Sequence, residues 1–123
     1  MNRKQLQQFI SETYGTNPEY PWAKSPDHMV FRHSDNRKWF ALIMDITKDR
    51  LGLPEKGPID VLNVKCDPLM IGSLRSETGI YPAYHMSKTN WITIALDGGV
   101  DAEKIKWLVD LSYRLTAKRQ KPQ

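Results

Sequence analysis

The chain has 123 residues, one cysteine and a net charge of +4. Apolar residues make up 40% of it and charged residues 26%, which is enough for one hydrophobic core without a metal or a disulfide. The lone Cys66 favours a reducing compartment. No apolar run approaches the roughly 20 residues of a membrane helix, and the polar N-terminus lacks a signal segment. We therefore expect one domain over residues 1–123, in the cytoplasm and without membrane contact.

The apolar spacing of residues 2–14 predicts an amphipathic helix that stops at Gly15. Strands are predicted over 29–33 and 39–46, because both segments are rich in β-branched, aromatic and aliphatic residues. The residues between them, 34–38, have turn chemistry. These two strands should form a hairpin.

Residues 59–66 alternate in a way that predicts a third strand, with Leu62, Val64 and Cys66 facing the core. Asp67 and Pro68 then predict a helix start, since an N-cap acceptor is followed by a proline that has no N–H to satisfy. This second helix should run to Glu77.

A second hairpin is predicted from strands 83–86 and 91–96 across the turn 87–90. Asp101 should cap a final amphipathic helix. The stripe that this helix buries consists of Ile105, Leu108, Val109, Ser112 and Leu115. The resulting order, α-β-β-β-α-β-β-α, indicates an α+β fold in which an antiparallel sheet and helices form a two-layer sandwich.

The excess positive charge lies at the end of the chain. Residues 114–123 hold Arg114, Lys118, Arg119 and Lys121 and no acid, whereas the other 14 basic residues balance 14 acidic ones. These cations either contact phosphates or simply oppose the dipole at the end of a helix. We expect residues 117–123 to form a basic, frayed tail.

No catalytic pattern is evident. The histidines lack metal-ligand spacing, and there is no Cys-x-x-Cys, Gly-x-Ser-x-Gly or P-loop. Cys66 precedes a helix start, which can activate a thiol, but a lone cysteine is more typical of a small buried hydrophobe. The sequence therefore predicts a non-enzymatic protein with no cofactor and no metal.

Aromatic and basic residues are interleaved in residues 81–91. The predicted hairpin would bring His85, Lys88, Asn90 and Trp91 to one rim, which could neutralise phosphates and stack a base, or cradle a small anion. The alternative is that Tyr84, Met86 and Trp91 pack against the last helix while the lysine is solvated.

This segment carries a family resemblance. Residues 79–88 (GIYPAYHMSK), 91–94 (WITI) and the closing amphipathic helix resemble the MmcQ/YjbR family of small bacterial proteins, and 39–41 (WFA) and 67–68 (DP) also fit. The resemblance implies the same element order, in a fold likened to type III secretion chaperones, and it implies DNA binding. The motif positions of the family fall on Tyr84, His85, Lys88 and Trp91. Members often have a second histidine where this chain has Asn90, which argues against roles that need two imidazoles.

We therefore expect a DNA-binding accessory protein. Its candidate binding residues come from the two hairpins and the C-terminal stretch: Tyr84, His85, Lys88, Asn90, Trp91, Arg37, Lys38, Arg114, Lys118 and Arg119. Arg37 and Lys38 could equally belong to a solvated turn. Two other functions stay open. One is a chaperone-like module that binds a protein partner or itself, because four tryptophans favour an interface. The other is a small-ligand-binding domain around His85.

Overall fold

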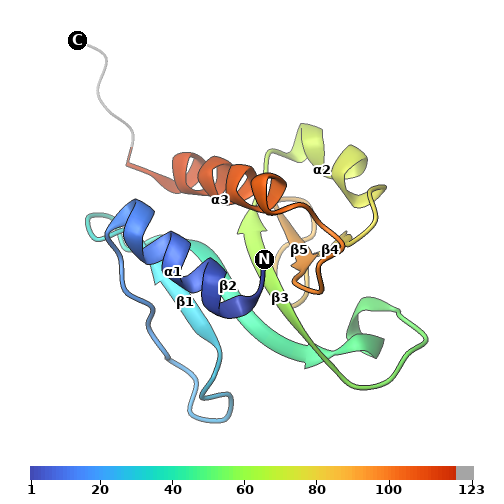
Figure 1. Cartoon of the computed structure of the whole chain (residues 1–123). Coiled ribbons are helices and arrows are strands. Elements are labelled where there is room, and N and C mark those ends of the chain that lie inside the picture. The colour runs from blue at the N-terminus through green and yellow to red at the C-terminus, as the bar shows by residue number, and fades with distance from the viewer. Residues whose placement is uncertain (119–123) are drawn as a thin grey trace.

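The computed structural model describes residues 1–118, so Arg119 and the rest of the predicted tail lie outside the described residues. Five antiparallel strands form one sheet in the order β1-β2-β3-β5-β4 (Figure 1). The elements are α1 (Arg3–Tyr14), β1 (Met29–Arg32), β2 (Trp39–Thr47), the 3-10 helix η1 (Lys48–Leu51), β3 (Pro58–Lys65), α2 (Pro68–Arg75), β4 (Ile80–Pro82), β5 (Trp91–Ala95) and α3 (Ala102–Thr116). The predicted α+β class and element order are confirmed. Within residues 1–118, no helix has the length and apolarity needed to cross a membrane.

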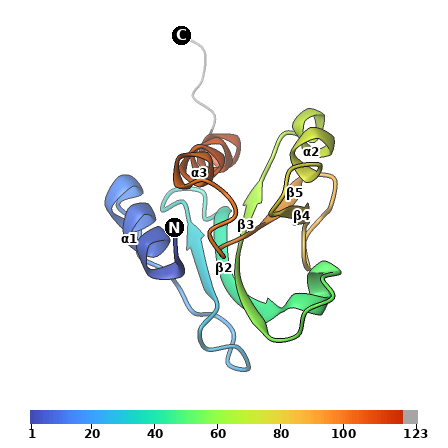
Figure 2. The ribbon, with the colours of Figure 1, turned by 45° about the vertical axis from the view of Figure 1, so that its right-hand side comes forward.

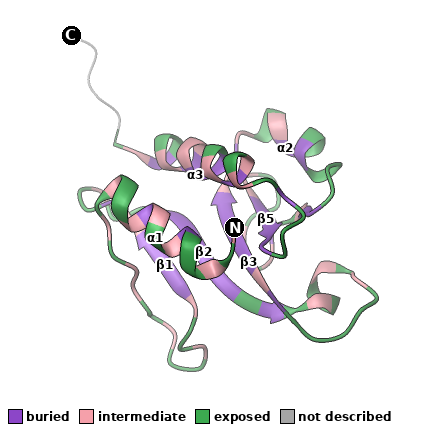
Figure 3. Ribbon diagram, in the orientation of Figure 1, coloured by how far each residue is buried: buried purple, intermediate pink, exposed green. Residues whose placement is uncertain are grey.

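The three α-helices all lie on one side of the sheet. α1 and α2 flank α3, and the apolar faces of all three helices join the same core cluster (Figure 2). The strands are almost wholly buried, whereas the helices expose their outer sides (Figure 3). The result is the predicted two-layer arrangement. Within residues 1–118 the second face of the sheet, which we call the helix-free face, carries no α-helix, and only Leu51 of the 3-10 helix η1 packs against it.

The first helix begins and ends where its sequence signals predict. The side chain of Asn2 accepts from the Gln5 N–H, and the Gln5 side chain accepts from the Asn2 N–H, each at 2.9 Å. This reciprocal capping box satisfies two of the N–H groups at the helix start. Gly15 ends the helix in the left-handed region with φ 62°.

Alternation along the central strands divides the apolar residues between the two faces. Leu62, Val64 and Cys66 pack under the helices, as predicted. Ile59 and Val61 join a second, smaller cluster on the helix-free face, which also contains Met44, Ile46 and Ala95. Both faces of β2 and β3 are therefore covered.

α3 is joined to the sheet by a buried serine. The Ser112 hydroxyl donates to the Phe40 carbonyl at 2.6 Å and accepts from the Lys65 N–H at 2.9 Å. Because Ala41 pairs with Val64, Phe40 and Lys65 stand at the next step of the β2–β3 ladder. The hydroxyl thus takes the place of a direct bond between strands. The stripe prediction was wrong at Leu115, which is 45% exposed.

The second hairpin differs from the prediction. Its first strand is β4, where Tyr81 pairs with Thr93, and residues 83–86 form no strand. The Tyr84 N–H instead donates to the Thr93 hydroxyl at 2.9 Å, so this backbone turns over the helix-free face. His85 has φ 57°, a region that non-glycine residues rarely adopt.

Candidate functional site

The helix-free face of the sheet is hollowed by a cleft of about 730 Å³. Leu42 and Met44 of β2 and Asn63 of β3 belong to its floor. One wall comes from residues 22–28 and the opposite wall from residues 84–86. The volume lies within the roughly 300–1,000 Å³ of typical ligand pockets.

Aromatic rings line this cleft on both sides. The Trp22 and Trp39 ring centroids lie 5.8 Å apart at an interplanar angle of 82°, and Trp22 also packs edge-on against His28 at 6.3 Å. On the other side, the rings of Tyr84 and His85 are 4.0 Å apart. The cleft therefore offers flat apolar surfaces beside imidazole nitrogens.

Buried polar side chains hold residues 84–86 in place. Asn63 donates from its amide to the Tyr84 carbonyl at 2.8 Å, and the Thr93 hydroxyl donates to the Asn63 side-chain oxygen at 2.5 Å. Asn63 and Thr93 are both fully buried. The polar groups under this wall are thus already paired, which fixes Tyr84 and His85 at the edge of the cleft.

Charged side chains stand at the rim. His28 contacts the Asp45 carbonyl at 3.0 Å and its carboxylate at 3.3 Å, and the Arg3 guanidinium reaches that carboxylate at 3.8 Å. Lys24 and Arg50 also line the cleft, and neither forms an ion pair within residues 1–118. These two cations are therefore available to a ligand.

No metal site is formed by the described residues. Among residues 1–118, no three His, Cys, Asp or Glu side chains converge. Burial raises the pKa of the Cys66 thiol, and the neighbouring Asp67 carboxylate adds to this rise, so the thiol is poorly activated.

A second surface lies where β1 turns into β2. Asn36 donates from its amide to the Thr116 carbonyl at 2.9 Å, and His33 Nε2 lies 2.8 Å from the Thr116 hydroxyl. These bonds tie the turn at 33–38 to the last turn of α3. Four cationic residues are thereby brought to one end of the molecule, which we call the basic end: Arg37, Lys38, Arg114 and Lys118.

Two of these four cations already have partners. Arg37 pairs with Glu19 at 3.2 Å, and Arg114 pairs with Asp110 at 2.9 Å. Both arginine side chains are still largely exposed, at 59% and 75%. Lys38 and Lys118 are exposed and form no ion pair within residues 1–118.

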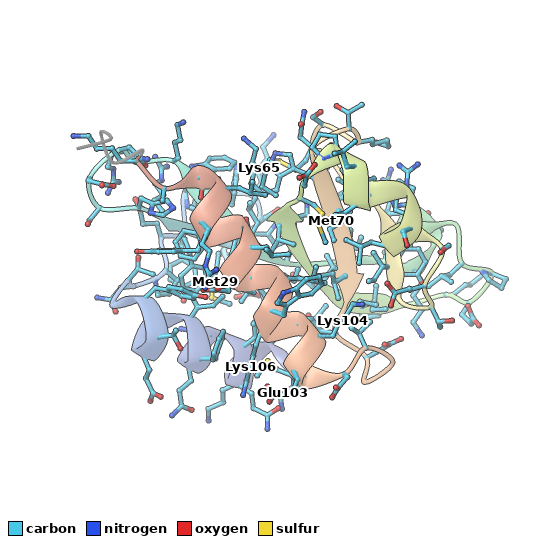
Figure 4. The ribbon with its side chains drawn as sticks, turned by 90° about the horizontal axis from the view of Figure 1, so that it is seen from above. Met29, Lys65, Met70, Glu103, Lys104 and Lys106 are labelled. Atoms are coloured by element: carbon cyan, nitrogen blue, oxygen red, sulfur yellow. The ribbon has the colours of Figure 1, made fainter. Side chains whose placement is uncertain are left out.

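The turn at 87–90 approaches the same end of the sheet. The Asn90 carbonyl accepts from the Cys66 N–H at 2.7 Å, and Trp91 is paired with Lys65 across β5 and β3. Seen from above, Lys65 stands beside the C-terminal part of α3, at the opposite end of that helix from Lys104 (Figure 4). Lys88 is exposed on this turn. The Asn90 amide is engaged locally, with the Ser87 and Thr89 hydroxyls.

The structure thus divides the predicted rim between two places. Tyr84 and His85 line the cleft, while Lys88, Asn90 and Trp91 lie toward the end of the sheet where Lys65 stands. Tyr84 packs against the cluster on the helix-free face rather than against the last helix. The cleft was not predicted from the sequence. The apolar residues on both faces of 40–44 do indicate a strand that has other residues packed on each of its two faces.

These features define a class: a two-layer α+β protein that leaves one sheet face free of α-helices and hollowed by an aromatic cleft. The YjbR family model matches residues 11–115. The chain belongs to the YjbR family, which confirms the resemblance seen in the sequence.

Relatives and solved structures agree. The chain is 40% identical over 116 residues to YyaQ of Bacillus subtilis, covering 94% of this chain and 98% of YyaQ. It is 33% identical over 54 residues to YjbR of Escherichia coli K12, covering 43% and 46% of the two chains. A crystal structure of a Pseudomonas syringae protein matches with a TM-score of 0.94 at 47% identity, over 95% of this chain and all of that one. The Deinococcus radiodurans protein DR2400, with a DUF419 domain, matches with a TM-score of 0.71 at 29% identity, over 93% and 77%.

Proposed function

We propose that this chain is a non-enzymatic DNA-binding accessory protein that uses its basic end. The observation that carries the proposal is the pair of contacts from His33 and Asn36 to Thr116. They join a turn and a helix end that are 80 or more residues apart in sequence, and so gather four cations on one surface. Phosphate contacts of this kind position a protein on DNA without reading its sequence.

The charges of this end favour a polyanion by a small excess, because its four cations lie among three carboxylates, those of Asp35, Glu19 and Asp110. Arg37 pairs with Glu19 and Arg114 with Asp110, but both arginine side chains remain exposed and can contact phosphate as well. Lys38 and Lys118 add two charges without internal partners in the described chain. Lys65 and Lys88 extend the surface toward Trp91.

Binding to a fluorescent duplex should therefore depend steeply on salt. Four phosphate contacts predict a slope of log K against log salt near −3.6, because each contact contributes about −0.9. The double variant Lys38→Gln/Lys118→Gln should weaken binding and reduce the magnitude of this slope by about 2.

The matched control is Lys4→Gln/Lys56→Gln, which removes two exposed lysines of α1 and of the loop before β3. It lowers the net charge equally but leaves the basic end intact. Equal losses in the two double variants would show that binding follows net charge alone and would refute the proposed surface. Absence of binding at about 50 mM salt would refute the proposal as a whole.

A further inference from the structure

We propose that the cleft on the helix-free face binds a nucleotide unit, meaning a planar base with its sugar and phosphate. This inference depends on the cleft and not on the basic end, so it goes beyond the proposed DNA-binding function. It follows from three properties of the lining: its aromatic walls, its charges and its length.

The walls suit a planar ring. Trp22 and Trp39 line one side and Tyr84 lines the other, above a floor that includes Leu42 and Met44. Bases stack on such aromatic side chains with little regard to base identity, because every base has a π-face. Trp22 and Trp39 pack edge to face at 82°, and the Arg32 guanidinium lies over the Trp39 ring. A base would therefore stack on the part of this aromatic pair that these contacts leave uncovered.

The rim charges suit the rest of a nucleotide. Lys24 and Arg50 form no ion pair within residues 1–118 and can meet a phosphate. Asp27 also lines the cleft, and a carboxylate is a common acceptor for ribose hydroxyls. Asp45 also lines the cleft, but its carboxylate repels an anion less than a free carboxylate would, because Arg3 and His28 already contact it.

The length of the cleft exceeds that of a single aromatic ring. Its lining follows β2 from Trp39 to Thr47 and continues to Arg50. The eight steps from Trp39 to Thr47 span at most about 26 Å at roughly 3.3 Å each. Base, sugar and phosphate can therefore lie in line, with the base near the tryptophans and the phosphate toward Arg50.

The same nucleotide unit could come from a free mononucleotide or from a single-stranded nucleic acid. The cleft is close to the cations of the first hairpin, since the Arg32 guanidinium lies 5.5 Å from the centre of the Trp39 ring. A single-stranded nucleic acid could thus pass from that hairpin into the cleft. The two sources are distinguished by comparing AMP with a short oligodeoxyadenylate.

The test is titration of the ¹⁵N-labelled full chain, followed through the tryptophan indole N–H signals in NMR spectra. AMP should shift the signals of Trp22 and Trp39, whereas Trp107, which is half-exposed on α3, should not move. Adenosine and inorganic phosphate, added separately, should each bind more weakly than AMP. Tighter binding of the oligonucleotide than of AMP would identify a single strand as the ligand.

Arg50→Gln should weaken AMP binding by about tenfold or more, as loss of a hydrogen bond to a charged group predicts, and should leave adenosine binding unchanged. Arg75→Gln is the matched control, because Arg75 ends α2 and does not line the cleft. Unshifted Trp22 and Trp39 signals with AMP, or equal affinity of Arg50→Gln and the unaltered chain, would overturn the inference. AMP binding retained in Lys38→Gln/Lys118→Gln would separate the cleft from the basic end, so either proposal can fail alone.

Discussion

Replacing Ser112 with alanine should weaken the junction between β2 and β3. In the folded protein the hydroxyl bridges the Phe40 carbonyl and the Lys65 N–H, and it is completely buried. Alanine would leave both backbone groups without this partner. Since α3 packs over the site, water cannot readily replace it.

The expected loss follows from these two bonds. A buried donor or acceptor left unsatisfied costs about 1–3 kcal/mol, so two of them give a loss of about 3 kcal/mol if the backbone relaxes partly. With an unfolding entropy of about 2.1 cal/mol/K per residue, this corresponds to a fall in Tm of about 12 °C for a chain of 123 residues.

Urea unfolding, followed by circular dichroism, measures this loss as a lower midpoint with an unchanged m value. Ser73→Ala is the control, because Ser73 is exposed on α2, and it should change stability by less than about 0.5 kcal/mol. A loss below about 0.5 kcal/mol in Ser112→Ala would refute the reasoning. It would mean that the two strands close up and form the direct bond once the hydroxyl is gone.

Two further changes test the packing. Burial lowers the pKa of His33 below its usual 6.5, so neutral His33 stabilises the fold above that pH, and this stability is lost as the pH falls through the folded-state pKa. Denaturation of the parent chain and of His33→Phe between about pH 5 and pH 8 should show a shallower pH dependence in the variant, and parallel curves would contradict this role. Gly79→Ala should cost about 1–3 kcal/mol in urea unfolding, because Gly79 has φ 89° and a Cβ would lie 2.6 Å from Val100 Cγ2. Gly72→Ala, in the open middle of α2, should instead add about 0.4–1 kcal/mol, and equal effects at both glycines would exclude the steric explanation.

Much of the fold could be predicted because its signals are local. The capping residues Asn2 and Asp67 both accept hydrogen bonds at the helix starts that they predict, whereas Asp101 precedes α3 without a side-chain cap bond. Alternation in residues 59–66 assigned Leu62, Val64 and Cys66 to the face on which they are observed. Such patterns depend only on the period of the strand or helix and on the chemistry of its ends.

The error at residues 83–86 has a long-range cause. Their apolar and aromatic residues resemble a strand, but the hydrogen bonds of Tyr84 go to the side chains of Thr93 and Asn63. Those partners lie 9 and 21 residues away along the chain. No residue near Tyr84 in the sequence indicates these two partners. Strand propensity alone therefore favoured residues 83–86 over β4.

The candidate site was only partly predictable for the same reason. Tyr84 and His85 were predicted to be candidate binding residues, but the cleft that they line is completed by Trp22, Trp39 and Arg50 from distant segments. No motif connects these positions. Likewise, the four cations of the basic end were identified as two separate groups, and only the bonds to Thr116 show that they share one surface.

The contacts to Thr116 also have a consequence for the order of folding. They join residues 80 and 83 positions apart, and the Ser112 bond to Phe40 spans 72. During synthesis from the N-terminus, the first hairpin leaves the ribosome well before α3 can dock on it. Such long-range contacts form late and slowly. The basic end, which needs cations from both segments, is therefore complete only in the finished fold and not in the nascent chain.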